Sequence, residues 1–124
     1  MLNQNCFSIN TYLQLEKIIQ LRKNKRRKLV VFIKNYLVKG FGINWLSAFI
    51  NLVKEKFPEQ NIKFFVDAGN DYGLSILILR EKIDYLRLKS NLQILKKINQ
   101  IAKKNKVVLN PQFDVVEVSK INMV

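Results

Sequence analysis

The sequence contains no histidine, one cysteine, two prolines and four glycines. The lack of histidine excludes a Ser-His-Asp triad, a histidine base at neutral pH and histidine metal sites. Because Cys6 is the only thiol, the chain forms no internal disulfide, CxxC redox pair or cysteine zinc cluster, which fits a reducing compartment. Most common hydrolase mechanisms are therefore excluded.

Long apolar runs are also missing, since none approaches the roughly 18 residues of a membrane-spanning helix. The opening residues 1–5 lack the basic and apolar regions of a secretory signal. A chain of 124 residues, 48% of them hydrophobic, is long enough to bury one core. We expect a single cytoplasmic domain.

Acidic residues are scarce, with nine against 22 basic ones, and the formal net charge is +13. Such a surface attracts phosphates, anionic lipids and acidic proteins. However, Lys, Asn and Ile together supply 45 of the 124 residues, as an AT-rich coding sequence would produce. The composition therefore favours codon bias as the origin of the charge.

Four short, mostly apolar runs predict β-strands, at residues 29–33, 62–66, 83–88 and 107–109. Apolar residues at helical spacing predict an N-terminal helix capped by Ser8 or Asn10, and three further helices, at 44–56, 72–82 and about 91–104. Residues 38–43 are expected to form the loop after the first strand. Proline after Phe57 and after Asn110 marks the ends of elements.

Strands that alternate with helices of crossover length indicate right-handed βαβ units and a parallel sheet. We therefore predict a small three-layer α/β domain with a four-stranded, mainly parallel sheet, preceded by an N-terminal helix. The flavodoxin-like strand order 2-1-3-4 is favoured, and a half-barrel order 1-2-3-4 is the alternative. The half-barrel would leave open edges that a homo-oligomer can cover.

Three segments follow from this interpretation. Residues 1–27 form the N-terminal helix and a basic segment packed on the domain, and residues 28–110 form the βα-repeat core. Residues 111–124 form a tail in which alternation at Val116 and Val118 indicates a possible edge strand.

Ligands of parallel α/β folds bind beyond the carboxyl ends of the strands, so a small anionic ligand is expected there. The candidate ligand-binding residues follow the first three predicted strands: Lys39, Gly40, Phe41, Gly42, Gly69, Asn70, Ser90 and Asn91. Neither GxGxxG, which Trp45 interrupts, nor the Walker pattern is present. Ordinary strand-to-helix connections and helix caps are the alternative for these residues.

Catalytic candidates are limited to Asp67, Asp71 and Lys89. The two carboxylates can hold Mg²⁺ or act as a base, and the lysine can form a Schiff base. The spacing favours a structural interpretation, with Asp67 in an Asx turn and Asp71 capping a helix. We therefore expect no enzyme activity and no cofactor, and a Mg²⁺-assisted or lysine-based enzyme is the third hypothesis.

A basic segment is the candidate nucleic-acid site, and consists of Arg22, Lys23, Lys25, Arg26, Arg27 and Lys28. A lysine face at 96, 97, 103 and 104 is expected to extend it. Because no RNA- or DNA-binding motif accompanies these residues, binding would be sequence-independent and salt-sensitive. A solvated surface is favoured, with nucleic acid, a membrane or an acidic protein as alternative partners. The primary hypothesis is a non-catalytic binding or scaffold domain.

Overall fold

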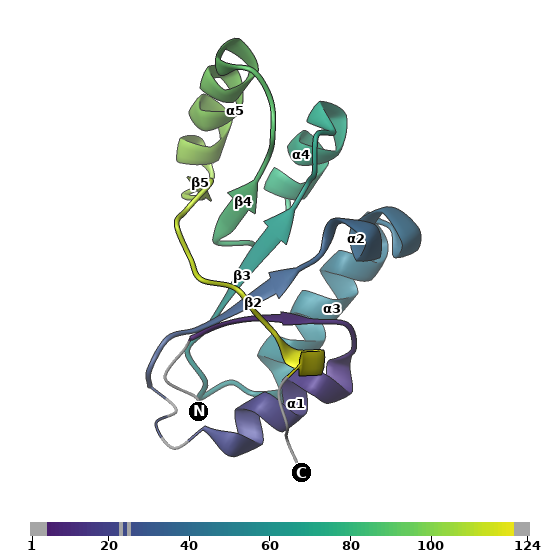
Figure 1. Ribbon diagram of the computed structural model, residues 1–124, viewed down its shortest axis with the longest axis vertical. Helices are drawn as coiled ribbons and strands as arrows, with labels where there is room; N and C mark the ends of the chain where they lie inside the picture. The colour runs from purple at the N-terminus through teal and green to yellow at the C-terminus, as the bar shows by residue number, and fades with distance from the viewer. Residues whose placement is uncertain (1–4, 23, 25, 121–124) are drawn as a thin grey trace.

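The computed structural model describes residues 5–22, 24 and 26–120. Six strands form one sheet in the order β5-β4-β3-β2-β1-β6, and every neighbouring pair is parallel (Figure 1). The strands are β1 (Cys6–Ile9), β2 (Leu29–Ile33), β3 (Ile62–Asp67), β4 (Tyr85–Arg87), β5 (Val108–Leu109) and β6 (Val116–Glu117). The four predicted strands are thus present and parallel, as β2 to β5.

Helices make the crossovers between the first five strands. They are α1 (Tyr12–Leu21), α2 (Asn35–Phe41), α3 (Ile43–Lys56), α4 (Tyr72–Leu79) and α5 (Leu92–Lys104), and a short 3₁₀ turn, η1 (Val118–Lys120), follows β6. Within the described ranges, no helix combines the length and apolarity that crossing a bilayer requires.

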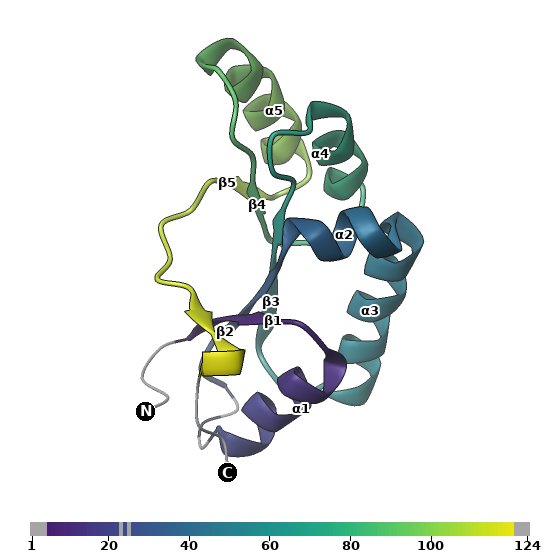
Figure 2. The same cartoon turned by 45° about the vertical axis from the view of Figure 1, so that its right-hand side comes forward.

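The domain has two main layers, so the predicted three-layer arrangement and the favoured order 2-1-3-4 are wrong. From β1 to β5, each crossover moves the chain to the next strand in the same direction. Because such crossovers are right-handed, their helices all pack on one face of the sheet. Figure 2 shows α2, α3 and α4 on that face, with the segment leading to β6 on the opposite side. The order of β2 to β5 is the one expected for the half-barrel alternative.

The sheet begins before the first predicted strand. Residues Cys6 to Ile9 form β1, all four of them buried, and pair with β2, whereas the sequence predicted a helix as the first element. The helix cap is Thr11, whose Oγ1 accepts a hydrogen bond from the backbone N–H of Gln14 at 3.2 Å, and not Ser8 or Asn10. Burial between β2 and β6 overrides the weak local signal of this short strand.

The predicted loop at 38–43 is also largely helical. Residues Asn35–Phe41 form α2, and Gly42, with φ of 93°, makes the junction with α3. Leu37 and Val38 are buried, and this packing stabilises a helix that contains Gly40. The conformation of Gly42 is one that other residues rarely adopt.

Apolar side chains pack on both faces of the sheet. The larger cluster lies between the sheet and the helices, with Leu46, Ile50, Phe64 and Leu86 among its most buried members. A smaller cluster on the opposite face consists of Cys6, Val30, Phe32 and Phe65, with Tyr85, Phe113 and Val115 packed against it. Residues 110–117, which we call the strap, cross this second face, which we call the strap face. Coverage on both sides explains the continuous apolar run of β2.

Candidate functional site

The strap is attached to the sheet at both ends. At its start, the side chain of Asn110 accepts from the backbone N–H of Leu88 at 2.9 Å and donates to the Leu88 carbonyl at 3.0 Å. At its end, β6 pairs with β1, and the Glu117 carboxylate forms an ion pair with Lys34. Between them, the Phe113 ring packs edge-on against Tyr85 at 5.0 Å. The strap is therefore a fixed wall over this face.

Arg87 ends β4 beside this wall. Strand alternation places its side chain on the strap face with Tyr85. Its guanidinium carbon lies 4.7 Å from the centre of the Phe32 ring and 5.2 Å from that of Phe65. The side chain is half-buried, and its plane is held by aromatic contacts rather than by a carboxylate.

The acidic residue in register with Arg87 makes a different bond. Asp67 on β3 pairs with Arg87 across the sheet, but its carboxylate accepts a hydrogen bond from the backbone N–H of Gly69 at 2.8 Å. Among the described residues, no hydrogen bond or ion pair involves the Arg87 guanidinium. Its fork of N–H donors is therefore available to an anion.

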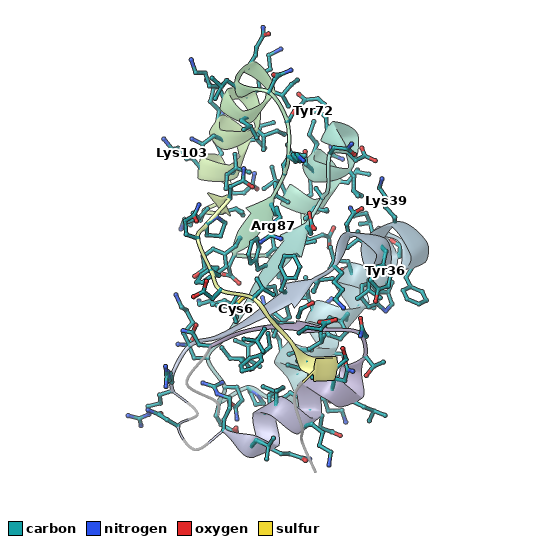
Figure 3. The ribbon with its side chains drawn as sticks, viewed as in Figure 1. Cys6, Tyr36, Lys39, Tyr72, Arg87 and Lys103 are labelled. Carbon is teal, nitrogen blue, oxygen red and sulfur yellow. The ribbon has the colours of Figure 1, made fainter. Side chains whose placement is uncertain are left out.

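A groove opens beside Arg87, between the start of α5 and the strap. Its volume is about 420 Å³, and its polar lining includes Arg87, Lys89, Ser90 and Gln112, with Phe113 as an apolar wall. Among the described residues, no aspartate or glutamate lines it. Figure 3 shows Arg87 over the strands, beside the path of the strap. The groove, which we call the Arg87 groove, combines two cations with hydrogen-bonding side chains and no acidic competitor.

The structure brings together only part of the predicted ligand site. Ser90 lines the Arg87 groove, beside the catalytic candidate Lys89, and Asn91 caps α5 by accepting from the backbone N–H of Ile94 at 2.9 Å. Gly69, with φ of 64°, and Asn70 lie in the turn after β3, where the Gly69 carbonyl accepts from the Lys89 backbone N–H. This turn is hydrogen-bonded to the backbone of a groove residue but does not itself line the groove.

The other predicted ligand residues lie elsewhere. Lys39, Gly40 and Phe41 belong to α2, and Figure 3 shows Lys39 on that helix, away from Arg87. Neither these residues nor Gly42 line the Arg87 groove. Of the three loops expected to form the ligand site, those at residues 69–70 and 89–91 lie beside one another. Residues 39–42 lie elsewhere, because the segment predicted as a loop forms the end of α2.

Of the catalytic candidates, both carboxylates make local structural bonds. Asp71 caps α4, accepting from the backbone N–H of Leu74 at 2.9 Å, and Asp67 closes the turn to Gly69. In the part of the chain that the structure describes, no three acidic or cysteine side chains group as a metal site would require. Mg²⁺ binding by Asp67 and Asp71 stays a prediction.

The basic segment lies at the opposite end of the molecule from α5, so the lysine face of α5 does not extend it (Figures 1 and 2). Lys28 is turned inward, donating to the Tyr85 hydroxyl at 3.2 Å. Arg22 donates to the Gln60 side chain at 3.1 Å, and burial, with the charge of Arg27, lowers its pKa. Arg26 and Arg27 are exposed, whereas Lys23 and Lys25 lie outside the described residues.

Two features of the strap face were not predicted. The first is Arg87 itself, together with the strap residues Gln112 and Phe113. The second is a polar cluster at the ends of β1 and β2, where Asn10 Oδ1 accepts from Lys34 at 2.8 Å and from the Tyr36 hydroxyl at 2.5 Å. For Arg87, the sequence did contain one signal: the alternation of β4 places its side chain on the same face as Tyr85.

No protein-family model matches the chain, and no curated protein matches it in sequence. The function is therefore inferred from the geometry of the site alone.

Proposed function

We propose that this chain is a non-catalytic binding domain that recognises an anionic group of its ligand in the Arg87 groove. The observation that carries this proposal is the half-buried guanidinium, which rests on two aromatic rings and has no acidic partner among the described residues. Partly burying a cation without a counter-charge costs free energy. An anionic ligand would offset that cost.

The surroundings of Arg87 support the same function. Phe32 and Phe65 hold the plane of the guanidinium, so little conformational entropy is lost when it binds an anion. Lys89 adds a second positive charge, and Ser90 and Gln112 add hydrogen-bonding groups at the same groove. Arrangements of this kind suit carboxylates and phosphates, which accept paired hydrogen bonds.

Calorimetric titration with inorganic phosphate and with a dicarboxylate tests the proposal, at near-physiological salt so that diffuse charge effects are screened. We expect Arg87→Gln to weaken binding by about tenfold or more, since it removes a charge-assisted hydrogen-bond pair. Arg87→Lys keeps the charge and loses the planar fork, so it should bind at an intermediate strength.

The matched control is Arg80→Gln, which removes the same charge at the exposed end of α4. It should leave anion binding unchanged. Equal losses in Arg80→Gln and Arg87→Gln would mean that net charge, and not the groove, attracts the anion. If Arg87→Gln binds phosphate and the dicarboxylate as tightly as the unmodified protein, the proposal is wrong.

Two other functions stay as weaker proposals. Sequence-independent nucleic-acid binding through the basic segment is less well supported, because Arg22 and Lys28 already have partners within the domain. Unchanged heparin retention after replacing Arg22, Lys23, Lys25, Arg26, Arg27 and Lys28 with glutamine would eliminate it. A Mg²⁺-assisted or lysine-based enzyme is also less well supported, because one oxygen of Asp67 and one of Asp71 accept backbone N–H groups in a local turn and a helix cap.

A further inference from the structure

A second hollow adjoins the Arg87 groove on the side of the edge strand β5. Its volume is about 250 Å³, and it is lined by Leu92, Leu95, Lys96, Asn99, Leu109 and Asn110. Leu95 and Asn110 line the Arg87 groove as well. The two hollows are therefore neighbours that share these two residues, and we call the pair the α5 trough.

The residues that α5 contributes lie on one row of the helix. Leu92, Leu95 or Lys96, and Asn99 are spaced by three or four residues, so their side chains are neighbours on the surface. Leu92, the first residue of α5, is 77% exposed, so its side chain is open to contact by a ligand. This row therefore presents two leucine side chains next to a lysine and an asparagine.

Charge and shape restrict what the α5 trough can bind. In the part of the chain that the structure describes, three cations line it, Arg87, Lys89 and Lys96, and no carboxylate does. It is an open surface channel rather than an enclosed pocket, so a compact small molecule would leave much of its own surface in water. Its apolar lining along α5 and β5 is aliphatic, with Leu92, Leu95 and Leu109, and one aromatic ring, that of Phe113, lies at the Arg87 end. A lining with a single ring suits leucine-like side chains better than a row of stacked bases.

We propose that the α5 trough binds an extended acidic polypeptide segment that carries apolar side chains between its carboxylates. One carboxylate would pair with Arg87 and another with Lys96, and an aliphatic side chain would pack on Leu92 and Leu95. The proposal rests on the proposed function at Arg87, because that residue supplies the first anion contact. The +13 charge of the whole chain would speed the encounter with such a partner.

Fluorescence polarisation with a labelled peptide of alternating glutamate and leucine tests the proposal on the full chain. We expect Leu92→Ser and Lys96→Gln each to weaken peptide binding at least about fivefold, since each removes a contact in the trough. Both variants should bind inorganic phosphate as the unmodified protein does, because Arg87 is intact. Leu13→Ser and Lys97→Gln, exposed positions outside the trough, are the controls and should bind the peptide normally.

The outcomes separate this proposal from the proposed function. If Leu92→Ser and Lys96→Gln bind the peptide normally while Arg87→Gln loses phosphate, the anion site stands and the peptide site is wrong. If phosphate binding is insensitive to Arg87→Gln, the proposed function fails first. A polyglutamate peptide that binds as tightly as the mixed one would overturn the role of Leu92. Tighter binding of single-stranded RNA, sensitive to the same two substitutions, would overturn the choice of partner.

Discussion

The Arg87 guanidinium rests on Phe32, at 4.7 Å from the centre of a ring that itself belongs to β2, two strands away in the sheet. The Phe65 ring on the intervening strand packs edge-on against Phe32 at 4.9 Å. A cation on the fourth strand is thus oriented by aromatic residues of the second and third. The orientation of the proposed anion site depends on this stack.

Phe32→Leu should therefore weaken anion binding several-fold, because Arg87 keeps its charge but loses the ring that holds its plane. The substitution should also lower the free energy of unfolding by about 1–2 kcal/mol. Calorimetric titration with phosphate and chemical denaturation measure the two effects. Phe49→Leu, at a ring of the helix face that stacks on Trp45, is the control. Phe49→Leu should lower stability and leave phosphate binding unchanged. If it weakens phosphate binding as much as Phe32→Leu does, lost stability alone explains the effect of Phe32→Leu.

Replacing two of the candidate ligand glycines, Gly69 and Gly40, with alanine should change the stability of the protein in opposite directions. A Cβ at Gly69 would lie 3.1 Å from the side-chain amide of Asn35, and its φ of 64° disfavours any L side chain. Gly69→Ala should destabilise the protein by at least about 1 kcal/mol. Gly40 lies within α2 with open space around it, so Gly40→Ala should stabilise by about 0.5–1 kcal/mol. Denaturant midpoints measure both, and destabilisation by Gly40→Ala would contradict the assignment of α2.

The ion pair between Lys34 and Glu117 should hold the end of the strap on the sheet. Both side chains are about one-quarter exposed or less, so Glu117→Gln leaves a partly buried ammonium without its counter-charge. We expect a loss of about 1–2 kcal/mol and faster hydrogen exchange at the amides of β6. Exchange measured by mass spectrometry tests this. Unchanged protection of β6 would mean that backbone pairing with β1 alone retains the strap.

Cys6 should make stability depend on pH in the alkaline range. Burial raises the pKa of its thiol from 9.0 to about 11, and the charge of Arg87 acts in the opposite direction. The fold therefore favours the neutral thiol, a contribution fully present below pH 9 and lost as pH rises from 9 to 11. It amounts to at most about 3 kcal/mol.

The comparison with Cys6→Ala isolates that contribution, since other groups titrate equally in both proteins. The difference in unfolding free energy between the two should shrink as pH rises from 9 to 11. A difference that stays constant over this range would show that Cys6 ionises at its ordinary pKa in the folded protein.

The sequence predicted the central strands because their apolar runs are continuous. Leu29–Ile33 is buried at all five positions, and a run this short with apolar residues throughout is typical of a strand covered on both faces. The first strand was missed because Cys6–Ile9 is short and contains Ser8, a residue that also caps helices. The helix α2 was missed because Gly40 and Gly42 resemble a loop, while the burial of Leu37 and Val38 that stabilises the helix is a tertiary effect.

Strand order and the groove depended on information that the sequence patterns do not carry. Crossover lengths predict parallel strands. They do not predict whether each new strand is added at the same edge of the sheet or at the opposite edge. Arg87 could be placed only as an outward residue of a strand until the strap was known to cross that face. Contacts such as Phe113 with Phe65 join residues 48 positions apart, so they follow from the fold rather than from local spacing.

The pairing of Phe7 with Val116 has a consequence for synthesis on the ribosome. The residues of β6 are translated after the other five strands, so β1 remains an uncovered edge of a nearly finished sheet while they are awaited. During that interval the aromatic surface around Phe65 is exposed to water, and the nascent domain is vulnerable to pairing with other chains. A chaperone that binds nascent chains would be of most use to this domain in the interval between the synthesis of β5 and that of β6.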